Sequence, residues 1–81
     1  MEKKFGTILI IIQSQENVNK LNTIISNHSD IILSRQGLSL KDRALNIISL
    51  IVDADSDNIG AITGQIGKLS GIRVKSSVLA L

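Results

Sequence analysis

The sequence contains no cysteine, proline, tryptophan or tyrosine, and Phe5 is its one aromatic residue. Without cysteine the chain forms no disulfide, no thiolate metal site and no cysteine-ligated iron–sulfur cluster. Because Phe5 is the single aromatic residue, the core must consist mostly of isoleucine, leucine and valine, a composition that suits β-strands. The basic residues are scattered and the net charge is only +2, which is a weak electrostatic basis for binding nucleic acid.

The chain is also short. Its 81 residues form a single domain, residues 1–81. A domain of this size buries only about 60–65% of its unfolded surface, so self-association is expected to add stability. The apolar run Ile8–Ile12 is too short for a signal sequence or a membrane span, which predicts a cytoplasmic protein with no membrane partner.

The spacing of apolar residues predicts six elements in the order βαββαβ, an α+β fold of ferredoxin-like type. This arrangement has a four-stranded antiparallel sheet with two helices on one face. The predicted strands are Thr7–Ile12, Ile31–Ser34, Leu45–Val52 and Ile72–Leu79; the helices begin at Val18 and after the cap Asp53–Asp55, and Gly71 ends the second. An offset of 41 residues pairs Val18 with Ile59 and Leu21 with Ile62, as expected for two related halves.

The predicted central strands are apolar on both sides. Ile8, Ile10 and Ile12 point one way, whereas Leu9 and Ile11 point the other. A sheet with helices on one face only should have a polar second face. We therefore expect the helix-free face to be covered by a second copy of the chain, in a two-fold dimer or a tetramer.

The second predicted helix carries an unusual row of glycines. Gly60, Gly64 and Gly67 share one face, which lies about 150° around the helix from its apolar face. Each glycine inside a helix costs about 1 kcal/mol relative to alanine. The pattern predicts that another backbone packs closely against these three residues.

Two features that could suggest a metal site have simpler explanations. The acidic run Asp53–Asp57 lacks the glycine and glutamate spacing of a calcium loop, and carboxylates at this position cap a helix. His28, the only histidine, falls at the end of the first predicted helix, where a positive charge is favourable. No metal ligand set within one chain and no cofactor are predicted; the alternative is a symmetric oligomer that brings several copies of His28 together.

Catalysis has little support in the sequence. Ser14 and His28 are the residues on which an acyl or phosphoryl hydrolase of this fold would depend, but no further base accompanies them. The loop after the first strand lacks the arginine that acylphosphatase-like enzymes need there. RNA-binding domains of this fold present aromatic residues on the central strands, and this chain has none. A protein without enzymatic activity is the favoured reading.

The first loop is the best candidate for binding a small molecule. Ser14, Gln15, Glu16 and Asn17 are polar and precede a helix N-terminus, where exposed amides can bind an anion. The alternative is that they only cap the helix. Gln36–Arg43 is expected to be a polar connection, whose later part could form a lip over a cleft between subunits.

Residues 58–76, with the glycine row followed by Gly71 and a strand, resemble a small bacterial family named for regulation of the iron-only hydrogenase system. The stretches Ile32–Gly37 and Ile47–Ala54 also fit. The family is similar in fold to ACT domains and to the C-terminal domain of the nickel-responsive regulator. The resemblance implies an oligomeric module of transcription regulation with a small-molecule effector, or an ACT-like domain that binds an amino-acid-type ligand.

Two departures limit what the resemblance implies. Glu16 and Asn17 stand where ACT domains that bind amino acids usually have a glycine. The histidine and cysteine ligands of the nickel-responsive regulator have no counterparts here, and its DNA-binding part is absent. Neither nickel sensing nor direct binding of DNA is therefore expected.

Overall fold

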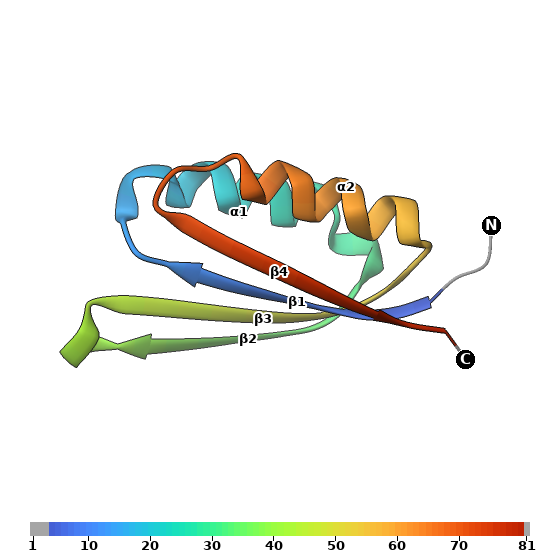
Figure 1. Ribbon diagram of the computed structural model, residues 1–81, viewed down its shortest axis with the longest axis horizontal. Coiled ribbons are helices and arrows are strands. Elements are labelled where there is room, and N and C mark those ends of the chain that lie inside the picture. The colour runs from blue at the N-terminus through green and yellow to red at the C-terminus, as the bar shows by residue number, and fades with distance from the viewer. Residues whose placement is uncertain (1–3, 81) are drawn as a thin grey trace.

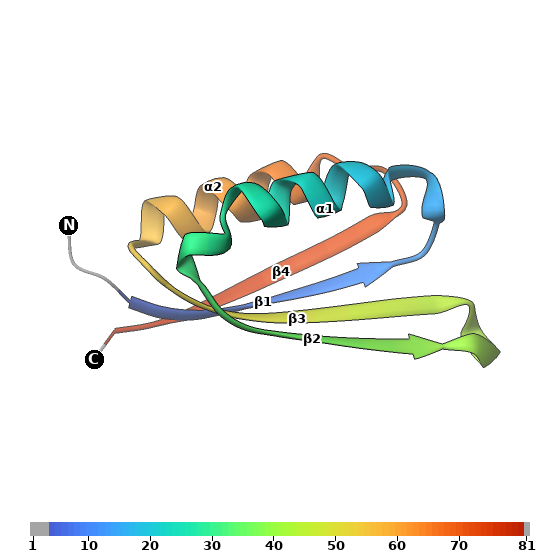
Figure 2. The same cartoon turned by 180° about the vertical axis from the view of Figure 1, so that it is seen from behind.

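The computed structural model describes residues 4–80 as a sheet covered on one face by two helices (Figures 1 and 2). The elements are β1 (Lys4–Ile12), η1 (Gln15–Asn17), α1 (Val18–Asn27), η2 (Ser29–Ile31), β2 (Ile32–Leu40), η3 (Lys41–Arg43), β3 (Leu45–Ala54), α2 (Ser56–Gly67) and β4 (Ile72–Leu79), where η denotes a short 3₁₀ helix. No helix of the described residues is long and apolar enough to cross a bilayer.

The sheet has the strand order β2-β3-β1-β4, and every neighbouring pair is antiparallel. In this register Leu9 of β1 lies between Ser49 of β3 and Lys75 of β4. Paired residues point to the same face of a sheet. The topology confirms the predicted βαββαβ fold, a ferredoxin-like and ACT-like arrangement.

The core is aliphatic, as the composition predicts, and lies between the sheet and the helices. Alternate residues of β1 and β3 point into it, and α1 and α2 contribute residues at helical spacing. Its largest fully buried side chains are Ile8, Ile10, Leu21, Leu50, Ile59, Ile62, Ile66 and Val52. Of the residues that the internal repeat pairs, Leu21, Ile59 and Ile62 are buried in the core and Val18 packs against it.

The other face of the sheet carries no helix, and its side chains are partly exposed. Leu9 is 46% exposed, Ile51 is 44% exposed and Phe5 is 40% exposed. Their register partners Thr7, on β1, and Ser49, on β3, share this face. The predicted division of the central strands into a buried and a helix-free apolar face is confirmed.

The strand β2 is longer than predicted. We expected Gln36–Arg43 to be a polar connection, but β2 continues to Leu40 and pairs with β3 as far as Leu45. The prediction failed because β2 is an edge strand that is exposed on both faces, so it lacks alternating apolar residues. Backbone pairing with β3 defines the strand instead.

The helix α2 is shorter than predicted at its C-terminal end. It ends at Gly67 rather than at Gly71, and β3 extends to Ala54, so only Asp55 of the expected cap is outside the strand. The Asp55 carboxylate accepts a hydrogen bond of 2.8 Å from the Asn58 amide, as an N-cap should.

Two glycines allow close approaches that the sequence did not reveal. A Cβ atom on Gly6 of β1 would lie 3.1 Å from the Ile59 side chain, which is how α2 can pack close to the sheet. Gly71 has a φ of 79°, and a Cβ atom there would lie 2.7 Å from Cβ of Ser14. Both conditions at Gly71 exclude any other residue without rearrangement.

We predict that Gly71→Ala lowers the free energy of unfolding by about 1–3 kcal/mol, because alanine is strained at this φ and collides with Ser14. Ser26→Ala is the control. Ser26 is exposed in α1, and alanine is the better helix former, so this change should stabilise the protein slightly. Urea denaturation of both variants measures the difference, and equal midpoints would contradict the role of Gly71.

Candidate functional site

The first loop, Ser14–Asn17, forms the turn η1 between β1 and α1. Ser14 is its N-cap, and the hydroxyl accepts a hydrogen bond of 3.2 Å from the Glu16 amide. This is the capping role that was the alternative to ligand binding.

The same loop is tied to the loop between α2 and β4. The Asn17 side-chain amide donates a hydrogen bond of 3.0 Å to the Ser70 carbonyl, and the Ser70 hydroxyl donates one of 3.1 Å to the Glu16 carboxylate. The Gln13 amide donates one of 2.8 Å to the Gly71 carbonyl. Ser14, Glu16 and Asn17 thus have structural partners, whereas Gln15 points elsewhere.

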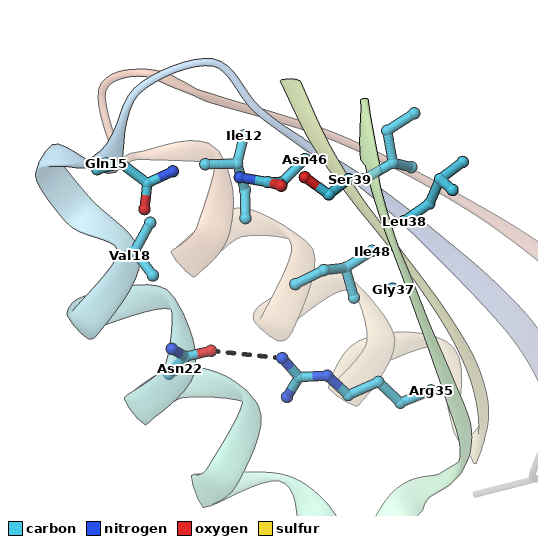
Figure 3. Close-up of a pocket in the computed structure, with 11 residues that line it drawn as sticks. Ile12, Gln15, Val18, Asn22, Arg35, Gly37, Leu38, Ser39, Asn46 and Ile48 are labelled. Carbon is cyan, nitrogen blue, oxygen red and sulfur yellow. Dashed lines mark hydrogen bonds between the residues drawn. The ribbon is translucent and has the colours of Figure 1, made fainter. Parts of the chain in front are cut away.

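Gln15 lies at the mouth of a groove between α1 and the hairpin formed by β2 and β3 (Figure 3). The groove has a volume of about 360 Å³. Its apolar floor consists of Ile12, Val18 and Ile48, which come from β1, α1 and β3. Ile12 and Ile48 are buried, so the floor is the edge of the core itself.

The rim of the groove is polar. Asn22 of α1 faces Arg35 of β2 across it, and Ser39 and Asn46 line the end nearer the hairpin turn (Figure 3). A guanidinium nitrogen of Arg35 donates a hydrogen bond of 3.5 Å to the Asn22 side-chain oxygen. Arg35 is the only charged residue among the described residues of this lining.

A second hollow continues the groove toward η3. It shares Gln15, Ser39 and Asn46 with the groove and adds Lys41. Among the residues the structure describes, neither lining includes an aspartate or a glutamate. The two hollows therefore favour anions over cations.

The glycine row lies on the exposed side of α2. A Cβ atom on Gly60 or Gly64 would meet nothing within 4 Å, and one on Gly67 would lie 3.6 Å from the Val74 side chain. Within one chain, therefore, nothing packs closely against Gly60 and Gly64. Close packing of a second chain on this face stays a prediction.

Ser14 and His28 are not brought together. They flank α1, whose ten residues separate them by about 15 Å at 1.5 Å per residue. Nδ1 of His28 lies 2.8 Å from the Ile24 carbonyl oxygen, one turn back in the same helix. Over residues 4–80 no group of three or more metal-ligating side chains occurs.

The residues that line the groove opposite Gln15 were missed by the sequence analysis. Arg35, Gly37 and Ser39 all lie on β2, but the sequence predicts a strand only as far as Ser34 and a connection over Gln36–Arg43. The predicted topology could have located these residues, because in this fold the edge strand next to β3 lies beside α1. Alternate residues of a correctly extended β2 would then have pointed to that groove.

Fold and site together define a small ferredoxin-like domain of the ACT-like class, with one uncovered sheet face and a groove beside its first helix. Residues 4–76 match the TM1266-like family, described as "Iron-only hydrogenase system regulator, putative". The chain belongs to this family, which confirms the resemblance seen in residues 58–76.

Solved structures agree with this assignment. The chain is similar to the uncharacterized protein TM1266 from Thermotoga maritima, with 34% identity, a TM-score of 0.91, and coverage of 98% of this chain and 100% of that one. An unknown protein from Galdieria sulphuraria shares the fold at 12% identity and a TM-score of 0.71, over 99% of this chain and 47% of that one. The designed protein Foldit4 does so at 18% identity and 0.62, over 99% of each chain. No curated protein matches.

We predict that Asn17→Ala lowers the free energy of unfolding by about 0.5–1 kcal/mol, because it removes the hydrogen bond to Ser70. Asn19→Ala is the control, since Asn19 is exposed in α1 and alanine is the better helix former. Thermal or urea unfolding measures both. If Asn17→Ala is as stable as the control, the hydrogen bond from Asn17 to the Ser70 carbonyl contributes nothing to the free energy of unfolding.

Proposed function

We propose that the chain is a regulatory module of the iron-only hydrogenase system that works without enzymatic activity, by self-association and by binding a small effector. The observation that carries this proposal is the apolar, helix-free face of the sheet. Its two central strands present Phe5, Leu9 and Ile51 to solvent, each at least 40% exposed. Contiguous apolar surface of this kind marks interaction sites in small proteins.

The pattern of side chains on this face resembles an interface. Ile11 and Ile47 extend the apolar centre, and they are directly opposite each other in the sheet. Arg73 and Lys75 of β4 border it on one side. An apolar centre with a polar rim is the usual anatomy of a protein–protein interface.

A second copy of the chain fits this face best. Two identical sheets stacked face to face, about 10 Å apart, would bury the same residues on both copies. Such a contact also supplies the second layer that a single domain of this size lacks. The family name as a regulator supports a role in control rather than in catalysis.

The glycine row of α2 offers a second contact. Gly60 and Gly64 lie on the helical layer, opposite the helix-free face of the sheet, and both positions are open. A helix with glycines on its exposed side can approach another helix closely. We propose that two dimers meet there to form a tetramer.

We predict that Leu9→Glu breaks the contact between sheets, so that a dimer becomes monomers and a tetramer separates into halves, because it places a charge in the centre of a buried apolar contact. In the monomer the new carboxylate is directly opposite Lys75, so the fold should tolerate it. Asn19→Glu adds the same charge on the exposed side of α1 and should leave the assembly unchanged. Native mass spectrometry measures the mass of the assembly that each variant forms. An unchanged assembly mass for Leu9→Glu would contradict the proposed interface.

Gly64→Leu tests the glycine contact separately. We expect it to convert tetramers into dimers, because a leucine side chain prevents close approach of two helices while the monomer has room for it. Size-exclusion chromatography with light scattering gives the mass of the assembly. An unchanged assembly together with unchanged thermal unfolding would show that nothing packs on this face.

A further inference from the structure

The groove between α1 and the β2–β3 hairpin combines two kinds of surface. Ile12, Val18 and Ile48 make an apolar floor, and side-chain amides and a guanidinium stand around it. Ligand sites of about 300–1,000 Å³ usually have this composition. The volume of about 360 Å³ therefore suits a small molecule with an apolar part and a polar head.

Arg35 supplies the charge at one end of the groove. It lies on the helix-facing side of β2, directly opposite the buried Leu50 in the register, and its side chain extends toward α1 (Figure 3). Its hydrogen bond to Asn22 is 3.5 Å long and goes to a neutral amide. A guanidinium has five donor hydrogens in a planar fork that matches a carboxylate, so this contact uses little of its capacity.

The remaining lining selects among anions. An amino acid would bring an ammonium group, and no described residue of the lining offers it a carboxylate. An oxo or hydroxyl group beside the carboxylate would instead find a donor on the side-chain amide of Asn22, next to Arg35. The apolar floor favours a ligand with an aliphatic chain over inorganic phosphate.

Gly37 keeps this space open. It lies in the middle of β2, opposite Ile48 of the floor, and a Cβ atom there would meet nothing within 4 Å. Glycine weakens a strand, and its presence inside one often marks a place where a ligand comes close. Any larger side chain at this position would occupy the groove without disturbing the core.

We propose that this groove binds a small aliphatic 2-oxo or 2-hydroxy acid, whose carboxylate pairs with Arg35 and whose chain rests on Ile12, Val18 and Ile48. This assignment rests on the proposed function in that it names the effector class and its site. The side-chain amide of Asn22, which lies beside the Arg35 guanidinium, hydrogen-bonds the oxygen next to the carboxylate. Of the four loop residues expected to bind a ligand, only Gln15 lines the groove, because the other three fasten the loop to Ser70 or cap it.

The test uses the full chain labelled with ¹⁵N and 4-methyl-2-oxopentanoate as the probe. We expect changes in the amide signals of Asn22, Arg35, Gly37 and Asn46 that saturate on titration. Leucine has the same carbon skeleton with an ammonium group, and 4-methylpentanamide has a similar chain without the charge. Both should bind at least about tenfold more weakly. The amide loses the charge pair with Arg35, which contributes about a factor of ten or more, and the ammonium group of leucine finds no carboxylate among the described residues of the lining. Equal binding of leucine, the amide or inorganic phosphate would overturn the proposal.

Variants locate the site. Arg35→Gln should weaken binding of the oxo acid about tenfold or more. Arg43→Gln, which removes the same charge from η3 outside the groove, should change it less than twofold. Gly37→Val should block binding while the protein keeps its unfolding temperature. If Arg35→Gln and Arg43→Gln bind alike, or if the signals that change lie elsewhere, the groove is not the site.

The same samples separate this proposal from the proposed function. Native mass spectrometry reports assembly without the probe, and the groove belongs to a single chain. The Leu9→Glu protein should therefore still bind the oxo acid within about threefold of the parent chain. A parent chain that assembles but does not bind the probe would overturn only the ligand assignment. A parent chain that is monomeric and binds the probe would overturn only self-association as the mode of action.

Discussion

The packing of two helices on one face of an aliphatic sheet is the constraint on which the rest of this structure depends. Ile8 and Ile10 of β1 are fully buried under α1 and α2, and the helices can cover no more than that one face. Two surfaces are therefore left uncovered. One is the helix-free face of the whole sheet, and the other is the helix-facing side of the edge strand β2. Every functional proposal for this chain concerns one of these surfaces or the exposed side of the helices.

Much of the fold can be predicted because burial imposes a period on the sequence. The alternation of Ile8, Ile10 and Ile12 with Leu9 and Ile11 fixes both the strand β1 and its two faces. The helical spacing in α1 and α2 does the same for the helices. Where burial is weak the pattern vanishes, as in β2, whose extent follows its pairing with β3.

The candidate site was only partly predictable, for the same reason. Gln15 was found because polar residues before a helix are a local signal. No short sequence pattern identifies Arg35 and Gly37 as site residues. They line the groove only because β2 folds beside α1. Likewise the partners of Glu16 and Asn17 lie on the far loop at Ser70, and no pattern within residues 14–17 points to them.

The exposed strand β2 has a consequence for communication between surfaces. Arg35 and Gly37 lie on the side of β2 that lines the groove, while Gln36 lies opposite Ser49 on the helix-free face, so one backbone separates the two surfaces. A strand held by neighbours on one edge only retains more freedom than the central strands. A molecule that binds to one side of β2 and immobilises the strand lowers the entropic cost of binding a second molecule on the other side. A groove ligand and a second chain would thus slightly favour each other's binding, without any change in the shape of the domain.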